Sequence, residues 1–296
     1  MSTLETPAED RSFIFERGQV GALLLHGLGG TPVEMRYVAM GLARAGITVS
    51  CPQLAGHSGS FEELRRSRWQ DWYASAEAAL DRLRRRCDTV VVGGLSMGAV
   101  LALLLAAERK GDVAGAAVYA PTLRLDGWGV PWYARLFQLV PHKAIANWFD
   151  FTEREPYGVK DPRVRALVAA AIESGDSAKA GMLTVPGGAM FEFRGLVGAV
   201  RRRVPGIRQP VLLVHPREDD RANIANSFWL QRNLAGPVSM VVLNDSYHVV
   251  TMDRQRQIVA DRTAAFVGVV ARERDEGAVT PAETLCPARR VPGCAA

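Results

Sequence analysis

A run of nineteen residues without a formal charge, from Thr89 to Ala107 (TVVVGGLSMGAVLALLLAA), restricts what this chain can fold into. The run is nearly long enough to cross a bilayer as one helix. Two consecutive glycines, Gly93 and Gly94, interrupt it, and glycine destabilises a helix interior. The run therefore indicates a buried strand followed by a buried helix, with the single polar residue Ser96 where they meet.

Other apolar runs of strand length alternate with helical patterns. The runs are rich in β-branched residues, which is typical of strands buried on both faces. They cover Val20–Leu25, Ile47–Cys51, Val90–Leu95, Ala114–Tyr119, Val211–Val214 and Val238–Leu243. Amphipathic helices are expected from Ser67, taken as an N-cap, to Leu83, and around residues 258–270. This alternation predicts an α/β fold with a mostly parallel, doubly wound sheet.

One interval of roughly 80 residues, 122–203, is far longer than a single crossover needs. It carries many of the aromatic residues, including Trp128, Trp132 and Trp148. We interpret it as a helical cap inserted at a strand's carboxyl end, over the mouth of the active site. The predicted core is then 12–121 with 204–271, and the termini 1–11 and 272–296 are expected to be disordered.

The segment around Ser96 carries a chemical motif as well. Gly94-Leu95-Ser96-Met97-Gly98 is G-x-S-x-G, preceded by an apolar strand and followed by an apolar helix, which is the context of a nucleophile elbow. Such a turn exposes the serine Oγ and places the N–H of Met97 at a helix start, where it can face an oxyanion. Ser96 is therefore the candidate nucleophile.

A serine nucleophile needs a base and an acid, which in this fold follow it in the order acid, then histidine. The loop after residue 214 contains Glu218, Asp219 and Asp220, and the loop after residue 243 contains His248. The three carboxylates compete for the role of the acid, and Asp245 is a further alternative. The remaining histidines are interpreted otherwise: His215 as structural, and His57 and His142 as lacking a partner recognisable by spacing.

A second oxyanion donor is expected after an early strand. Leu25 is followed by His26-Gly27-Leu28-Gly29-Gly30, and the N–H of Leu28 is the natural donor. His26 is interpreted as a residue that orders this turn. A phosphate-binding role for the glycines has little support, because neither G-K-[ST] nor G-x-G-x-x-G occurs.

Composition excludes several other classes of function. The net charge is +5, but only four of the 36 basic residues are lysines and the arginines are scattered, so Arg84–Arg86 and Arg201–Arg203 are interpreted as helix ends rather than a nucleic-acid site. Cys51, Cys87, Cys286 and Cys294 show no C-x-x-C spacing, which indicates reduced thiols and no bound metal. The first residues lack the apolar core of a secretory signal, so a cytoplasmic location is expected.

These motifs, in this order, resemble the bacterial carboxylesterase and monoacylglycerol lipase group of the α/β-hydrolase superfamily. The resemblance spans about residues 12–270 and is carried by LLLHGLGGTPVEM, GLSMGA, PVLLVHPREDD and DSYHVVTMD. It implies a triad of Ser96, Asp219 and His248, with Leu28 and Met97 as backbone oxyanion donors and a small helical cap over an acyl pocket. The insertion departs from the group, since GWGVPWYARL and EREPYGVKDPR have no role that can be transferred.

The expected function is hydrolysis of carboxylic esters through an acyl-enzyme, without cofactor or metal. The aromatic cap indicates a small-molecule substrate with an apolar acyl or aryl group. Neither a nucleic-acid partner nor stable membrane insertion is expected. An acyl thioesterase with the same triad is the first alternative, and a catalytically silent binding module with this fold is the second.

Overall fold

A computed structural model of the chain describes residues 10–57, 60–173, 182 and 184–279. Its centre is a seven-stranded sheet in the order β1-β3-β2-β4-β5-β8-β9, in which only β1 runs antiparallel to its neighbour. The predicted doubly wound α/β fold is confirmed. The strands are β1 (Phe13–Phe15), β2 (Val20–Leu25), β3 (Thr48–Cys51), β4 (Thr89–Leu95), β5 (Gly115–Tyr119), β8 (Val211–Pro216) and β9 (Val238–Leu243).

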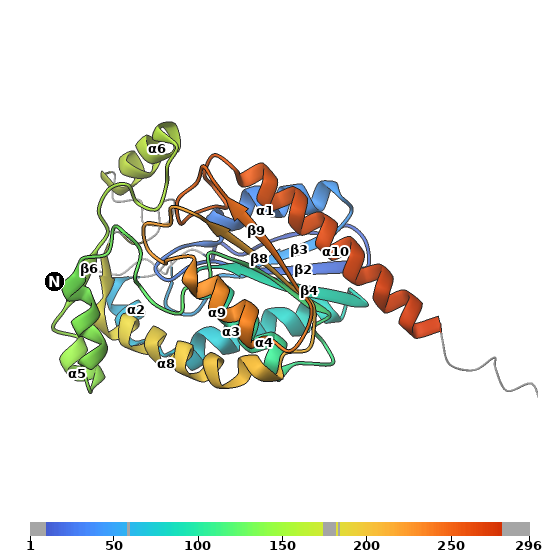
Figure 1. Cartoon of the computed structure of the whole chain (residues 1–296), viewed down its shortest axis with the longest axis horizontal. Coiled ribbons are helices and arrows are strands. Elements are labelled where there is room, and N and C mark those ends of the chain that lie inside the picture. The colour runs from blue at the N-terminus through green and yellow to red at the C-terminus, as the bar shows by residue number, and fades with distance from the viewer. Residues whose placement is uncertain (1–9, 58–59, 174–181, 183, 280–296) are drawn as a thin grey trace, which may run out of the picture.

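Helices cover both faces of this sheet (Figure 1). On one face lie α1 (Arg36–Arg44), which follows the short 3-10 helix η1 (Pro32–Met35), and α10 (Arg256–Val279). On the other lie α3 (Trp69–Arg84), α4 (Met97–Glu108), α8 (Gly187–Arg203) and α9 (Ala225–Asn233). The helices on each face cover a separate cluster of buried apolar residues. One cluster includes Leu101 and Val118, and the other includes Val49 and Tyr119.

The uncharged run divides as expected into β4 and α4. All seven residues of β4 are buried, and the buried residues of α4 extend from Met97 to Ala106. Burial on both faces of the sheet therefore accounts for the absence of charge. No helix in the described part of the chain is long and apolar enough to cross a membrane.

Ser67 does not begin a helix, which corrects one expectation. It follows α2 (Phe61–Arg66), whose N-terminus is capped by Ser60, and its hydroxyl donates to Leu64 O (2.8 Å). The same hydroxyl accepts a hydrogen bond from Trp72 Nε1 (2.9 Å), so Ser67 joins α2 to α3 instead. Serine is common at N-caps, but here the Ser67 side chain bonds to a carbonyl at the end of the preceding helix instead.

The inserted segment has mixed secondary structure. It contains the 3-10 helix η2 (Trp132–Leu139), α5 (Lys143–Ala146), α6 (Pro162–Glu173) and a two-stranded antiparallel sheet of β6 (Asp150–Thr152) and β7 (Thr184–Pro186). Figure 1 shows α5, β6 and α6 together at one end of the molecule. The last predicted cap segment, α8, instead packs beside α3 and α4 and contributes Leu196 and Val200 to the core before η3 (Val204–Gly206).

The expected C-terminal tail begins later than the sequence indicates. Helix α10 continues beyond Arg272 to Val279, so residues 272–279 are helical rather than disordered. Figure 1 shows the last part of α10 extending from the body of the molecule. At the other end Arg11 is described, and its N–H donates to Gln53 Oε1 (2.8 Å). Residues 1–9 and 280–296 of the expected tails, which include Cys286 and Cys294, lie outside the described residues.

Candidate active site

Ser96 occupies a sharp turn between β4 and α4. Its backbone has φ 57° and ψ −112°, a conformation that L-residues rarely adopt, and its N–H donates to Tyr119 O (2.9 Å). The flanking glycines make the turn possible. A Cβ at Gly94 would lie 2.4 Å from Gly98 C, and one at Gly98 would lie 2.2 Å from Leu25 O. The backbones of the elbow and of β2 therefore approach too closely for any side chain at these two positions.

The Ser96 hydroxyl has a partner that the motif did not reveal. Its Oγ lies 3.1 Å from Thr122 Oγ1, and Thr122 donates its own hydroxyl proton to Ala120 O (3.1 Å). A threonine hydroxyl has one proton, so Thr122 must accept the hydrogen bond from Ser96. In this arrangement the Ser96 proton points to Thr122.

Asp219 and His248 form a buried pair. Nδ1 of His248 lies 2.9 Å from each carboxylate oxygen of Asp219. Asp219 Oδ1 also accepts from the N–H groups of Arg221 and Ala222 (2.8 Å each). Burial alone would raise the pKa of Asp219, but the charge of His248 and these hydrogen bonds outweigh it and lower the pKa. Asp219 is thus held as a carboxylate, and it selects the His248 tautomer that carries its proton on Nδ1.

The competing carboxylates have other partners. Glu218 is exposed and pairs with Lys160 (2.7 Å), while Asp245 pairs with Arg254 and Lys160. Asp220 accepts from the backbone N–H of His248 (3.2 Å) and of Gly158 (3.1 Å), so it fixes the His248 loop without touching the imidazole. Among the described residues, the carboxylate of Asp219 is the one hydrogen-bonded to the His248 ring.

His215 lies behind this pair. Its Nε2 donates to Ala222 O (2.8 Å), so its Nδ1 accepts from Ser227 Oγ (2.8 Å). Burial lowers the pKa of His215, which keeps the ring neutral. It is a structural support of the loop that carries Asp219.

The glycine-rich turn after β2 lies against the nucleophile. A Cβ built on Gly27 would be 3.7 Å from the Cβ of Ser96. His26 orders this turn: its Nδ1 donates to Gly27 O (2.9 Å) and its Nε2 accepts from Leu54 N (3.2 Å). Burial lowers the pKa of His26 to about 3, so the ring is neutral. Among the hydrogen bonds found within the described residues, none is donated by the N–H groups of Leu28 and Met97, the expected oxyanion donors.

Glu34 is a residue of the site that sequence reasoning missed. Its Oε2 accepts from Gly27 N (3.1 Å), and its carboxyl fills the space that a side chain at Gly30 would need. Burial raises the pKa of Glu34 to about 7, opposed by the Gly27 hydrogen bond and, more weakly, by the charges of His248 and Arg221. Glu34 thus connects the turn beside Ser96 with the His248 side of the site. Nothing in the segment TPVEM signals this role.

The insertion is attached to the loops that carry Asp219 and His248. Trp128 Nε1 donates to Glu218 O (3.0 Å), and the Trp128 ring contacts that of Tyr247 at 5.4 Å between centroids. Val249 N donates to Gly158 O (2.8 Å), and Arg221 forms an ion pair with Glu153. The loops that carry Asp219 and His248 are therefore held by contacts with the insertion as well as by the strands that they follow.

Acyl transfer by a serine needs a histidine base held by a carboxylate and backbone donors for the oxyanion. The structure places Ser96 on a strained elbow and pairs His248 with Asp219, while the Ser96 hydroxyl bonds to Thr122 and not to His248 among the described residues. No group of three or more His, Cys, Asp or Glu residues in the described part of the chain is arranged to hold a metal ion.

Comparison with known proteins agrees with this architecture. Residues 22–262 match the model of the alpha/beta hydrolase family. The thermostable monoacylglycerol lipase of Bacillus sp. (strain H-257) is 29% identical over 255 residues, covering 86% of this chain and 92% of the lipase. The carboxylesterase of Bacillus subtilis (strain 168) is 25% identical, covering 87% and 96%.

Solved structures show the same fold. The structure of a lipolytic enzyme from the metagenome-derived pair LipS and LipT has a TM-score of 0.73 at 25% identity, covering 88% of this chain and 98% of that one. The monoacylglycerol lipase of Paleococcus ferrophilus has a TM-score of 0.71 at 14% identity, covering 89% and 99%. The similarity extends over almost the entire length of both structures.

Proposed function

Because this chain belongs to the alpha/beta hydrolase family, we propose that it hydrolyses carboxylic esters through a triad of Ser96, His248 and Asp219. The observation that carries the proposal is the pair of 2.9 Å contacts from His248 Nδ1 to Asp219, in a site where Ser96 stands on a strained elbow. The curated relatives, a monoacylglycerol lipase and a carboxylesterase, support an ester as the substrate.

In the proposed mechanism, His248 Nε2 removes the Ser96 proton while Oγ attacks the ester carbonyl carbon. The tetrahedral oxyanion is bound by the N–H groups of Leu28 and Met97, each contributing about 3 kcal/mol in comparable sites. The imidazolium, stabilised by Asp219, returns its proton to the leaving alcohol as the C–O bond breaks. Water, deprotonated by His248, then attacks the acyl-enzyme, and Ser96 regains its proton when the acid leaves.

We infer a substrate that pairs an apolar acyl or aryl group with a small alcohol, of which a monoacylglycerol is one example. The monoacylglycerol lipase among the relatives supports the apolar part. The polar groups near the site, Glu34, Glu153 and Arg221, support a polar leaving group.

The first test is covalent labelling with a fluorophosphonate probe, located by mass spectrometry. We expect one adduct, on Ser96, that is absent from a Ser96→Ala variant. A chain that stays unlabelled, with no turnover of any ester, would instead be a binding module that retains the fold.

The substrate class is tested with p-nitrophenyl esters of graded acyl length, a monoacylglycerol and an acyl-CoA. We expect the highest kcat/KM on an oxygen ester. Preference for the acyl-CoA would identify a thioesterase that uses the same triad.

A further inference from the structure

The turn Gly27-Leu28-Gly29-Gly30 beside Ser96 has little restraint of its own. Three of its four residues are glycine, and Gly29 has φ 72°. Glycine adopts more backbone conformations than other residues, so this composition does not hold the turn in one shape. A backbone N–H that binds an oxyanion must nevertheless be placed to within about 0.5 Å. Contacts from outside the turn therefore have to fix its shape.

The direction of the Leu28 N–H follows from the Gly27 carbonyl, because both belong to one peptide group. The Gly27 carbonyl accepts hydrogen bonds from His26 Nδ1 (2.9 Å) and from Gly30 N (3.2 Å). A trans peptide group is planar, so its N–H points away from its C=O. The Leu28 N–H is therefore directed away from the His26 ring for as long as Gly27 keeps this orientation.

Glu34 fixes the other peptide group of Gly27. Its Oε2 accepts a hydrogen bond from Gly27 N (3.1 Å). Glu34 itself is placed by η1, where its N–H donates to the carbonyl of the buried Thr31 (3.1 Å). Gly27 is buried, and a buried N–H without a partner is unfavourable. Loss of the carboxyl would therefore favour other conformations of the turn.

Gly30 leaves the space in which the Glu34 carboxyl lies. A Cβ built at Gly30 would be 2.2 Å from Oε1 and 2.5 Å from Cδ of Glu34. The φ angle of Gly30 lies outside the left-handed region, so the backbone conformation alone does not require glycine. The contact with Glu34 accounts for a glycine at this position.

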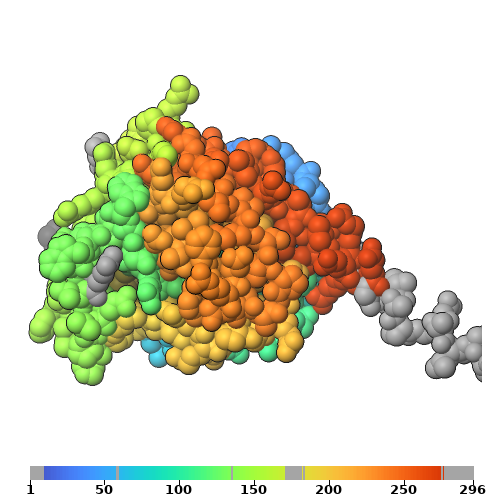
Figure 2. Space-filling model, in the orientation of Figure 1, coloured from blue at the N-terminus to red at the C-terminus, as the bar shows by residue number. Residues whose placement is uncertain are grey.

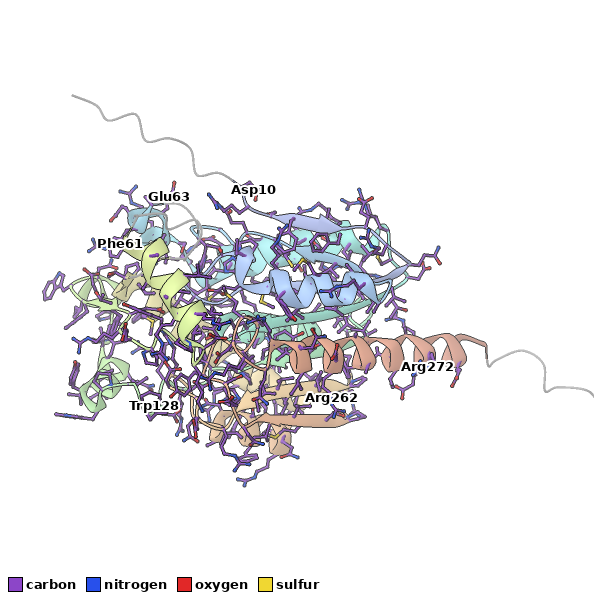
Figure 3. All side chains as sticks on the ribbon, turned by 90° about the horizontal axis from the view of Figure 1, so that it is seen from above. Asp10, Phe61, Glu63, Trp128, Arg262 and Arg272 are labelled. Carbon is purple, nitrogen blue, oxygen red and sulfur yellow. The ribbon has the colours of Figure 1, made fainter. Side chains whose placement is uncertain are left out.

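The insertion contacts the same turn at Gly29. Met182 N donates to Gly29 O (2.7 Å), and a Cβ built at Gly29 would lie 3.0 Å from Cγ2 of Val185 in β7. Figure 2 shows the insertion, in green to yellow-green, at the end of the molecule opposite the last part of α10, and Figure 3 labels Trp128 at that end. The turn is thus held at Gly29 by the insertion and at Gly27 by the core.

We propose that Glu34 is a positioning residue of the oxyanion site. Its carboxyl oxygen holds Gly27 in the orientation that directs the Leu28 N–H toward the oxyanion of the reaction. This inference rests on the proposed function, because it takes Leu28 as one of the two donors. It adds the residue that keeps this donor in place.

The role belongs to the acceptor oxygen of Glu34 rather than to its charge. Burial raises the pKa of Glu34 to about 7, with Glu153 adding to the rise, while the Gly27 hydrogen bond and the charges of His248 and Arg221 oppose it. Both protonation states are therefore present near neutral pH. A carboxylate and a carboxyl group each offer an oxygen that can accept from Gly27 N, and so does the amide of glutamine.

The test is steady-state kinetics on the p-nitrophenyl ester that the unmodified chain turns over best, with sites titrated by the fluorophosphonate so that unfolded chain is not counted. Glu34→Ala should lower kcat about tenfold or more and change KM less than about twofold, because the oxyanion exists only beyond the ground state. Glu34→Gln should stay within about threefold of the parent kcat.

A trifluoromethyl ketone with the same acyl group gives a second readout, because its adduct with Ser96 carries an oxyanion. Its affinity for Glu34→Ala should fall by the factor by which kcat/KM falls. A general loss of stability would not produce this agreement.

Gly30→Ala tests the same contact while keeping the carboxyl. The added methyl should displace the Glu34 carboxyl and reproduce the kinetics of Glu34→Ala. The double variant should be no slower than either single variant, because the methyl then fills the space that the carboxyl has left. Glu62→Ala is the control and should match the parent, since its exposed carboxylate pairs with Arg65 and Arg66 on α2.

Three results would overturn the role of Glu34: a Gln variant as slow as the Ala variant, an effect of Glu34→Ala on KM alone with unchanged affinity for the ketone, or additive effects of Gly30→Ala and Glu34→Ala. Failure of the proposed function is seen separately, as absence of a fluorophosphonate adduct on the unmodified chain.

Discussion

At the scale of single residues, Asp219 shows how neighbouring carboxylates acquire different roles. Glu218 pairs with Lys160 and Asp220 accepts from two backbone N–H groups, so neither touches the imidazole. The Asp219 carboxylate accepts hydrogen bonds from the backbone N–H groups of Arg221 and Ala222, and it also contacts His248 Nδ1. Its orientation is therefore fixed before any substrate arrives.

Asp219→Asn should lower kcat by about 10⁴, because the amide favours the wrong imidazole tautomer and cannot stabilise its cation. Ester turnover measures this directly. Asp245→Asn is the matched control and should retain near-wild-type turnover, since Asp245 pairs with Arg254 and Lys160. The reverse ranking of the two variants would show that the acid is misassigned.

The Ser96 hydroxyl donates to Thr122 and not to His248 in this structure. Thr122→Val keeps the shape and removes the acceptor, so the Ser96 hydroxyl should turn more readily to His248. One neutral hydrogen bond contributes about 1 kcal/mol, and its loss should speed fluorophosphonate labelling about fivefold.

Thr122→Ser retains the hydroxyl and should label at the parent rate. The direction of the change in labelling rate is informative, because general damage to the site would slow labelling rather than speed it. A slower or unchanged rate in the Val variant would mean that Thr122 does not restrain Ser96.

The sequence predicted the residues that belong to a motif and not those that only meet in space. Order along the chain and position after a strand were enough to select His248 and a run of three carboxylates. Choosing Asp219 among them needed the resemblance, and the structure shows why: only its side chain reaches Nδ1. Thr122 and Glu34 lie 26 and 62 residues from Ser96 along the chain, and no local pattern links them.

At the scale of elements, the elbow depends on how closely β2, β4 and α4 approach. The Cβ that Gly98 lacks would lie 2.2 Å from Leu25 O and 2.5 Å from His26 O, both of them backbone atoms that cannot move aside. The strained Ser96 conformation is tolerated because sheet and helix are both fully packed around it.

Gly98→Ala should therefore lower the free energy of unfolding by about 3 kcal/mol or more, or prevent folding. Urea denaturation measures the change. Gly111→Ala provides the comparison, since nothing lies within 4 Å of the added methyl. Equal stability of the two variants would contradict the close approach at the elbow.

Strands were easier to predict than the ends of helices. Strands of five to seven residues stand out as continuous apolar runs, and Val20–Leu25 and Val238–Leu243 have the predicted bounds, although the second is only partly buried. The edge strand β1 was missed because three residues with mixed exposure give no such run. The ends of α3 and α10 depend on side-chain contacts and on length, which local propensity does not determine.

At the scale of the whole molecule, buried neutral histidines make stability depend on pH, and His26 and His57 form one pair of them. His26 and His57 are fully buried, with ring centroids 5.0 Å apart, and the His57 ring also contacts Trp72. Burial lowers the pKa of His57 to about 4 and that of His26 to about 3. Below pH 6.5 the unfolded chain binds protons that the folded chain does not, so stability falls as pH falls.

His57→Gln should reduce this pH dependence by about 1.4 kcal/mol per pH unit between pH 6 and pH 4.5, within the range set by the two pKa values. Urea denaturation at several pH values gives the slopes. Glu34 acts in the opposite direction, because its raised pKa favours the folded state at low pH, but it is present in both proteins. Parallel slopes for parent and variant would show that His57 is not held neutral.

The attachment of the insertion to the loops of Asp219 and His248 has a consequence for how relatives of this chain could be diversified. Gly158 accepts from Val249 N and donates to Asp220, while Lys160 bridges Glu218 and Asp245. A chimera that receives another relative's lid, grafted between β5 and β7, would lose supports of the loops that carry Asp219 and His248. To change substrate specificity, the insertion and the two loops would have to be exchanged together, whereas the turn that carries Ser96 could be kept.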